Sequence, residues 1–170
     1  MISEEQTTAD WQSELPPELS LGIQVRLLFR ALDRLLGIYL APWNCPSGHW
    51  YLLRALRTQD GTTQGRLADI NNVTESTLTI QIVRMEKAGL VVRKRSESDK
   101  RKVHVFMTEK GKELYEGFMP WAININEIAT RGIDKAKIDT VLDVLKSLTE
   151  NVLDELLVCA SEKGPRGTNC

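Results

Sequence analysis

The chain has 170 residues, of which 42% are hydrophobic and 26% are charged, and its formal net charge is −1. Its length and apolar content suit a folded domain with a genuine core, and no run of 18 apolar residues predicts a membrane span or a membrane partner. The acidic start at Glu4, Glu5 and Asp10 is unlike a secretion signal, and an odd set of three cysteines suits a reducing compartment, so we expect a cytoplasmic protein.

One domain is expected at residues 18–160, because both ends of the chain are polar and contain proline. We expect those ends, residues 1–17 and 161–170, to be flexible. A first long helix is predicted at about residues 18–42. Apolar side chains recur along it at helical spacing: Leu21, Val25, Leu28, Leu32, Leu35 and Tyr39, flanked by Leu27, Phe29, Leu36 and Leu40. So wide an apolar face needs packing partners on two sides.

A short helix is predicted at residues 64–71, because Thr62 and Thr63 can cap its exposed N–H groups. Its buried side should consist of Leu67, Ala68 and Ile70. Asn71 and Asn72 then favour a turn, since asparagine accepts the backbone conformations that turns require. A second helix follows this turn, so the pair predicts a helix-turn-helix.

The second helix should start after Thr74 as its N-cap, run through Lys87 and stop at Gly89. Its buried face should carry Leu78, Ile82 and Met85, at the spacing i, i+4, i+7. The opposite face carries Ser76, Thr77, Ile80, Val83, Arg84 and Lys87. Small hydroxyls and Arg84 on this face suit base edges or phosphates, and Ile80 suits a thymine methyl group. The alternative for Ile80 and Val83 is packing against a neighbouring element.

A basic β-hairpin is predicted after the second helix. Val91 and Val92 begin one strand, and residues 103–107 alternate apolar and polar side chains as a half-buried strand does. Residues 96–99 form a polar turn, with Lys100 and Arg101 near the tip. Residues 84–112 hold ten Lys and Arg against four Asp and Glu, whereas the rest of the chain is acidic. Such a hairpin is either a solvated loop or a DNA-binding wing, and the preceding helix-turn-helix favours the wing.

Two further helices are predicted at residues 108–131 and after Asp134. Thr108 suits the N-cap of the first, and Pro120 should kink it. The last helix has a wide apolar stripe: Ile138, Val141, Leu142, Leu145, Leu148, Val152, Leu153, Leu156 and Leu157. Because the small winged core cannot cover both terminal helices, we expect a homodimer. An intramolecular helical hairpin is the alternative.

These elements predict a fold that is mainly α with a small β-hairpin: a winged helix-turn-helix core at about 46–107 between dimerisation helices at about 18–42 and 108–160. The segments LADINNVTESTLTIQIVRMEKAGLV and SDKRKVHVFMTEKG resemble the DNA-binding core of the multiple antibiotic resistance regulator (MarR) family of winged helix-turn-helix transcription factors. The resemblance implies that Arg101 enters the minor groove and that Asp99 orients it or braces the wing. The chain departs from the family where many members have an arginine, here Ile80, and an aspartate, here Val83.

The resemblance also implies a two-fold dimer with interleaved terminal helices, which presents two recognition helices and two wings to one side of DNA. The expected partner is pseudo-palindromic double-stranded DNA, with half-sites about 10 bp apart, and repression is the expected outcome. The candidate DNA-binding residues are Thr63, Gln64, Ser76, Thr77, Ile80, Arg84, Lys87, Asp99, Lys100 and Arg101.

A small-molecule effector is expected near the first helix, where the family often holds a ligand pocket. Aromatic, titratable and cationic side chains gather there in the sequence, and two residues of the linking helix could close the pocket. The candidates are Arg26, Arg30, Trp43, His49, Trp50, Trp121 and Asn124. Their chemistry suits a small phenolic or aromatic carboxylic acid, which would separate the two DNA-binding lobes.

Three other functions are alternatives to a ligand-responsive DNA-binding regulator. A redox-responsive regulator of the same family would use Cys45, although no neighbouring base is evident to lower the pKa of its thiol. A winged-helix module that contacts only proteins would favour acidic residues on the groove face, which is neutral to basic here. An enzyme is not expected, since the sequence has no phosphate-binding glycine loop, no nucleophile elbow and no paired histidines; we likewise expect no metal site and no cofactor.

Overall fold

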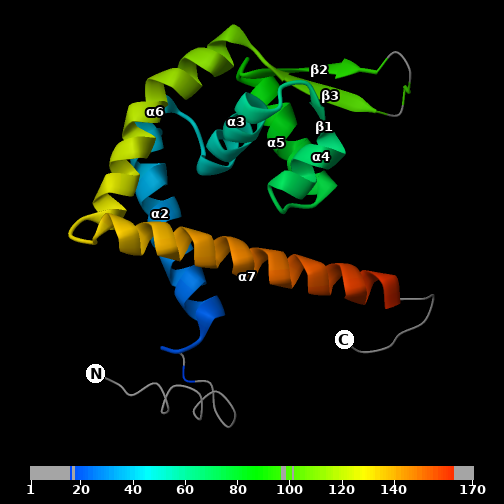
Figure 1. Ribbon diagram of the computed structural model, residues 1–170. Helices are drawn as coiled ribbons and strands as arrows, with labels where there is room; N and C mark the ends of the chain where they lie inside the picture. Colours follow the sequence, from blue (N-terminus) through cyan, green and yellow to red (C-terminus); the bar gives the residue numbers. More distant parts are fainter. Residues whose placement is uncertain (1–15, 17, 97–98, 101, 163–170) are drawn as a thin grey trace. The chain divides into compact units, whose positions relative to one another are not determined.

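The computed structural model describes residues 16, 18–96, 99, 100 and 102–162. In chain order the elements are α2 (Leu21–Leu40), η2 (Ala41–Trp43), α3 (Ser47–Thr58), β1 (Thr62–Thr63), α4 (Gln64–Ile70), α5 (Glu75–Lys87), β2 (Val91–Arg95), β3 (Val103–Met107), α6 (Glu109–Thr130) and α7 (Lys135–Glu162) (Figure 1). Contacts divide the chain into two compact units, Met1–Asn126 and Glu127–Cys170. The predicted flexible ends lie almost entirely outside the described residues, although α7 continues to Glu162.

The helix-turn-helix forms where capping residues predicted it. The Thr63 hydroxyl accepts a hydrogen bond from the N–H of Arg66 at 3.3 Å, and the Thr74 hydroxyl accepts from the N–H of Thr77 at 3.2 Å. Between the two helices Asn72 adopts a left-handed φ of 49°, which asparagine tolerates better than most residues. These local signals confirm the starts of α4 and α5 and the turn between them.

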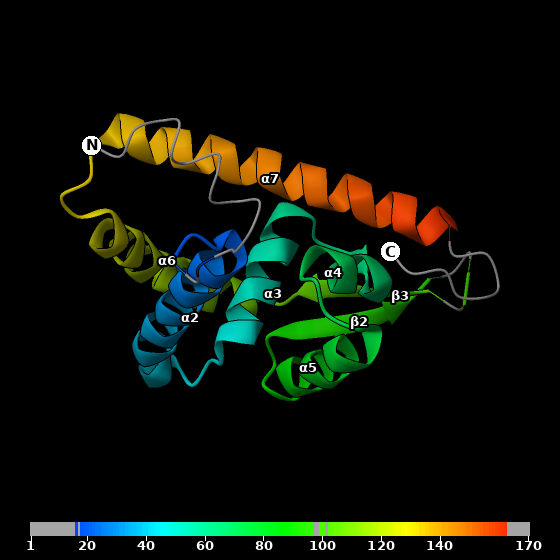
Figure 2. The ribbon, with the colours of Figure 1, turned by 90° about the horizontal axis from the view of Figure 1, so that it is seen from below.

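Gly89 ends the recognition helix, the name used below for α5. Its φ of 74° is one that glycine adopts without steric cost, and Leu90 then returns its N–H to the Met85 carbonyl at 2.9 Å. The chain is thereby turned directly into β2, and Figure 2 shows α5 running beside this strand.

The sheet has three antiparallel strands in the order β1-β3-β2. Strands β2 and β3 form the predicted hairpin, in which Val91 pairs with Met107 and Arg95 pairs with Val103. Strand β1 was not predicted: Thr62 is buried and pairs with Val105. Two threonines separated by about 40 residues from their partner strand carry no periodic signal, so the sequence could indicate only their capping role.

Two hydrophobic clusters hold the first unit together. The cluster beneath the helix-turn-helix contains the predicted face of α5, and the second joins the end of α2 to α6. The first includes Leu52, Leu53, Leu56, Leu67, Leu78, Ile82, Met85, Val91 and Val105; the second includes Leu36, Leu40, Cys45, Trp50, Phe118, Ala122 and Ile125. Ile70 was expected on the buried side of α4, but it is 45% exposed, because at about 100° per residue it points well away from the direction that the buried Leu67 and Ala68 share.

Much of the predicted apolar surface of the two long helices is uncovered within the chain. On α2 the side chains of Val25, Leu27, Leu28 and Phe29 are 44–55% exposed, whereas Leu36 and Leu40 are buried. On α7 the exposed apolar side chains are Val141, Leu142, Val144, Val152, Leu153, Leu156 and Leu157. Such contiguous apolar surface marks an interaction site in a folded protein.

The predicted fold class is confirmed, since helices dominate and the small antiparallel sheet follows a helix-turn-helix. The role of the long helices in dimerisation remains a proposal. Thr108 caps α6 as predicted, and Pro120 lies inside that helix. The N–H of Ala136 donates to the Asp134 carboxylate at 2.9 Å, which confirms the predicted start of α7. None of the described helices is long and apolar enough to cross a membrane.

Candidate nucleic-acid interface

The outer face of the recognition helix is open to solvent. Its exposed residues are Ser76, Thr77, Ile80, Arg84 and Lys87, with Ile80 at 55% exposure, whereas Val83 is half-buried. At the start of this face the Thr74 hydroxyl lies 2.9 Å from that of Thr77 and 3.0 Å from that of Ser76. Three hydroxyls therefore sit together at a helix N-terminus, where the helix dipole favours a phosphate.

Arg84 lies at the edge of this face where α5 meets α3. Burial lowers the pKa of His49 on α3, and the positive charge of Arg84 lowers it further. A nearby guanidinium thus helps to keep the buried imidazole neutral. Arg84 remains exposed, so its guanidinium can also contact a polyanion such as DNA.

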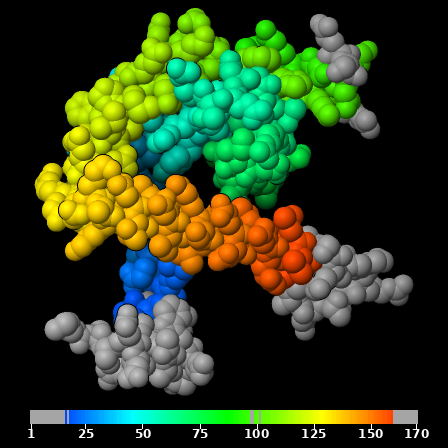
Figure 3. All heavy atoms as spheres, viewed as in Figure 1, coloured from blue at the N-terminus to red at the C-terminus, as the bar shows by residue number. Residues whose placement is uncertain are grey.

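The wing is defined as β2, β3 and their turn, and its two strands stand out from the body formed by α3 and α4 (Figure 3). Its exposed basic residues include Lys94, Arg95, Lys100 and Lys102. In the turn the Lys102 N–H donates to the Asp99 carbonyl at 2.8 Å, and the Asp99 N–H donates to the Ser96 hydroxyl at 3.2 Å. Arg101 lies outside the described residues, so its expected partnership with Asp99 remains a prediction.

The base of the wing is packed against the turn that follows α3. The Nδ1 atom of His104 lies 2.7 Å from the carbonyl oxygen of Gly61, within hydrogen-bond distance. The Phe106 ring lies directly over Gly61. On the same strand face Lys94 Nζ is 5.0 Å from the centroid of Phe106. Because Gly61 has a φ of 72° and no room for a Cβ, this turn depends on glycine.

A small cavity of about 330 Å³ lies where the first helix of the helix-turn-helix meets the wing. Thr63, Gln64 and Lys102 line it, together with Glu75. Among the described residues, the buried Nε2 of Gln64 has no hydrogen-bond partner. The exposed Lys102 can pair with an anionic oxygen here, although the Glu75 carboxylate shares the cavity. Thr63 and Gln64 were predicted; Lys102 was counted in the basic run but not assigned a role.

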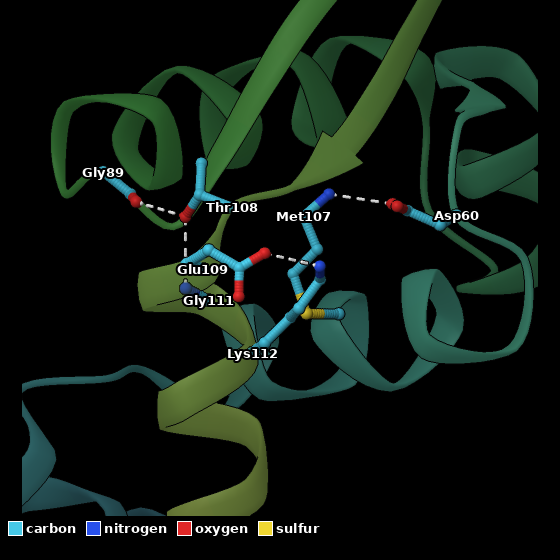
Figure 4. A network of polar contacts seen from close by, with 7 residues as sticks. All are labelled: Asp60, Gly89, Met107, Thr108, Glu109, Gly111 and Lys112. Atoms are coloured by element: carbon cyan, nitrogen blue, oxygen red, sulfur yellow. Dashed lines mark hydrogen bonds and ion pairs between the residues drawn. The ribbon is translucent and has the colours of Figure 1, made fainter.

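Thr108 joins the end of the recognition helix to the start of α6 (Figure 4). Its hydroxyl donates to the Gly89 carbonyl at 2.6 Å and accepts from the Gly111 N–H at 3.1 Å. Its own N–H donates to the Leu90 carbonyl at 3.0 Å. Gly111 is buried, and a Cβ at this position would overlap the Leu90 carbonyl oxygen. The recognition helix, the wing and α6 are therefore held by one short segment.

The residues predicted to bind a ligand do not form one cluster. Trp43 and Trp121 line a shallow cavity of about 580 Å³ with Tyr39, whose ring centroid is 5.5 Å from that of Trp121. Trp50 is instead a core residue: it is 1% exposed, stacks on Tyr115 at 5.3 Å and meets Phe118 edge-on. A tryptophan in a sequence does not reveal whether its ring is buried, so this placement needed the tertiary contacts.

The remaining predicted ligand residues are scattered. Arg26 and Arg30 are exposed on α2, Asn124 is half-buried on α6, and His49 is buried. A separate groove of about 500 Å³ is lined by residues of α2, α3 and the helix-turn-helix. Its lining residues are Phe29, Gly48, Tyr51, Arg54, Ala55, Thr58, Ile70, Asn71, Val73 and Gln81. The predicted arginines line neither cavity, whereas Arg54 supplies a guanidinium to the groove.

The chain is similar in sequence and structure to known transcriptional regulators. The MarR family model matches residues 46–103. A SlyA-like transcription regulator from Listeria monocytogenes is 30% identical, with a TM-score of 0.74, and the match covers 85% of this chain and 96% of that one. The chain belongs to the MarR family.

Two further matches are also transcriptional regulators. A putative MarR family transcriptional regulator from Listeria monocytogenes, solved in complex with 26mer DNA, is 29% identical with a TM-score of 0.75, covering 87% of this chain and 99% of that one. The HTH-type transcriptional regulator YybA of Bacillus subtilis (strain 168) is 24% identical over 76% of this chain and 86% of its own length. The chain is thus a winged-helix transcriptional regulator, and the expectation that it is not an enzyme is confirmed by its family.

Cys45 offers little to a redox-responsive MarR protein. Its side chain is 4% exposed, and its Sγ lies 3.6 Å from the Pro46 carbonyl oxygen. Burial raises the pKa of the thiol to about 11. Because the thiolate is the species that reacts with oxidants, burial and the raised pKa disfavour a redox role for Cys45.

Proposed function

We propose that this MarR-family chain is a dimeric repressor that binds a pseudo-palindromic operator and is released by a small anionic aromatic ligand. The observation that carries the DNA-binding part is the exposed hydroxyl and basic face of α5 beside a protruding basic wing. The related regulator from Listeria monocytogenes that was solved with 26mer DNA supports it. A DNA-binding protein must meet the chromosome, so we propose that it acts in the cytoplasm.

We propose that the recognition helix enters a major groove. Ser76 and Thr77 would hydrogen-bond phosphates or base edges, Ile80 would meet a thymine methyl group, and Arg84 and Lys87 would contact phosphate or guanine. Lys102 supports a phosphate contact next to the groove, because it is exposed and lines one cavity with Thr63 and Gln64. At the wing tip Arg101 would enter the minor groove, with Lys100 on the backbone and Asp99 as its brace.

The dimer is proposed on the exposed apolar faces of α2 and α7. Each fully buried leucine contributes about 1.5–3 kcal/mol relative to an exposed one, so leaving these faces in water carries a large cost. A second copy of the chain has the same apolar faces, and pairing the two copies would remove these faces from water. Two-fold pairing would then present two recognition helices to half-sites about one helical turn apart.

Titration of labelled DNA from upstream of the protein's own reading frame tests the DNA-binding proposal. Fluorescence anisotropy should show tight binding at low salt. If about eight phosphates are neutralised per dimer, the affinity should fall by about 10³- to 10⁵-fold between 50 and 200 mM salt. A scrambled duplex of equal length is the control. Equal affinity for both duplexes, or an affinity insensitive to salt, would show that the proposed function is wrong.

The effector is proposed to bind in the 500 Å³ groove. Phe29 and Val73 offer apolar surface, and Arg54 offers a guanidinium that can pair with a carboxylate. Burial and the nearby carboxylate of Asp33 raise the pKa of Tyr51, whose hydroxyl therefore stays protonated and can donate to the same ligand. Because Gln81 lines the groove and belongs to the recognition helix, a ligand there would touch the DNA-reading element. A coupling of about 1–3 kcal/mol is typical of such linked sites.

Calorimetric titration with a panel of benzoic and phenolic acids tests the effector proposal. Arg54→Ala should weaken binding by about 10-fold or more, because a charge-assisted hydrogen bond is lost. Trp121→Ala changes the separate aromatic cavity and should leave the affinity unchanged. The groove is the wrong site if Trp121→Ala abolishes binding while Arg54→Ala does not, and the effector class is wrong if the wild-type protein binds no member of the panel.

A further inference from the structure

The last turn of the recognition helix is bonded to the first strand of the wing. The Arg93 guanidinium donates to Glu86 Oε2 from Nη2 at 2.8 Å and from Nε at 3.1 Å. The backbone N–H of Arg93 also donates to Glu86 Oε1, at 3.3 Å. One carboxylate therefore holds both the side chain and the main chain of β2.

The geometry of this pair differs from that of an ordinary surface ion pair. Both side chains are 34% exposed, so water screens them only in part. The Arg93 hydrogen bonds lower the pKa of Glu86, which keeps the carboxylate charged. Arg93 also lies opposite Val105 of β3, so the Glu86 carboxylate is tied to the centre of the hairpin and not to a loose end.

The pair also alters which wing charges are open to DNA. The guanidinium of Arg93 is already neutralised by Glu86, whereas Lys94 and Arg95, the next two residues of β2, are exposed. Among the described contacts of this basic strand, Arg93 is therefore the residue that forms an ion pair with the recognition helix. Its place in the sequence, inside a basic run, gave no sign of this difference.

We propose that Glu86 and Arg93 are positioning residues, which fix the angle between the recognition helix and the wing so that both reach the same half-site together. The inference rests on the proposed DNA-binding function. Neither residue needs to touch DNA for this role. A DNA-binding protein whose two reading elements are held in register loses less conformational entropy when it binds.

The DNA affinity of Glu86→Gln distinguishes two roles for Glu86, an effect of its charge alone and the positioning of the wing, because the two roles predict changes in opposite directions. If the charge of Glu86 only repels phosphate, its removal raises the affinity for DNA and Arg93→Gln lowers it. If the pair sets the angle of the wing, both substitutions lower the affinity, by about 5- to 10-fold each. The double variant should then be no weaker than either single variant, because the same contact is lost in all three.

The salt dependence of binding separates positioning from phosphate contact. Arg93→Gln should leave the slope of log affinity against log salt unchanged, whereas the control Arg95→Gln should make the slope shallower by about one unit. Reversal of the pair, Glu86→Arg with Arg93→Glu, should restore part of the lost affinity. Should Glu86→Gln fail to fold, Arg93→Lys keeps the charge but loses the paired donors, and it should lower the affinity to the same extent.

The outcomes distinguish this inference from the function on which it rests. Wild-type protein that shows no salt-dependent DNA binding overturns the proposed function itself. Wild-type protein that binds, with Glu86→Gln equal to it or tighter, overturns only the positioning role. A lower affinity in both single variants, an unchanged slope for Arg93→Gln and recovery in the reversed pair together establish the role.

Discussion

Replacement of Arg101 by alanine is expected to weaken operator binding by about 10- to 100-fold while the dimer stays intact. The physical reason is that a narrow minor groove concentrates negative potential and favours an inserted guanidinium. Arg101 follows the exposed Lys100 in the turn of a wing whose base is fixed by Gly61 and His104. Because the base of the wing is fixed and its tip is charged, we expect the loss of the Arg101 side chain to lower the DNA affinity strongly.

Anisotropy titration at fixed salt measures the effect of Arg101→Ala, and sedimentation velocity checks the dimer. Arg57→Ala is the matched control, because it removes an exposed guanidinium from α3, outside the proposed interface. The control should bind DNA as the wild type does. A variant lacking Arg101 that keeps wild-type affinity would mean that the wing tip does not contact DNA.

Introduction of a charge into the apolar stripe of α7 should have an effect at least as large. Leu156 is 58% exposed in the single chain and lies near the C-terminal end of the stripe. Leu156→Glu would place two carboxylates in the proposed dimer interface, which costs far more than the lost burial. We expect the dimer to dissociate at micromolar concentration. DNA affinity should then fall by about 10²- to 10⁴-fold, because two half-sites are no longer read by one linked molecule.

The control for Leu156→Glu is Asn151→Glu, which adds the same charge about 140° around α7 from Leu156, outside the predicted stripe. Sedimentation equilibrium and anisotropy should show a wild-type dimer and wild-type DNA affinity for this control. A dimeric Leu156→Glu protein would contradict the proposed interface. Dissociation of both variants would point to unfolding of α7 instead, which circular dichroism reports directly.

Elements with local signals could be predicted from the sequence. Thr63, Thr74 and Thr108 each cap a helix within three residues of themselves, and Gly89 ends one through its own backbone conformation. The apolar spacing of α5 likewise fixed its buried face. Such features depend on neighbouring residues, so a single sequence contains the information for them.

Features that depend on distant residues could not be predicted in the same way. Strand β1 exists only through its pairing with β3, and Trp50 is buried only because Tyr115 and Phe118 lie against it. The basic run could be recognised as a whole, but Arg93 differs from its neighbours through a contact with Glu86. The candidate DNA face was therefore more accessible to sequence reasoning than the ligand site, which several separate segments build.

The Thr108 junction has a consequence for how such a regulator can diversify. Gly89, Thr108 and Gly111 bind one another so closely that the end of the recognition helix and the first turn of α6 must shift as a unit. Substitutions further along α6, beyond Pro120, leave that unit intact. Over generations, the distal part of α6 can therefore change while the attachment of the recognition helix to α6 is inherited unaltered.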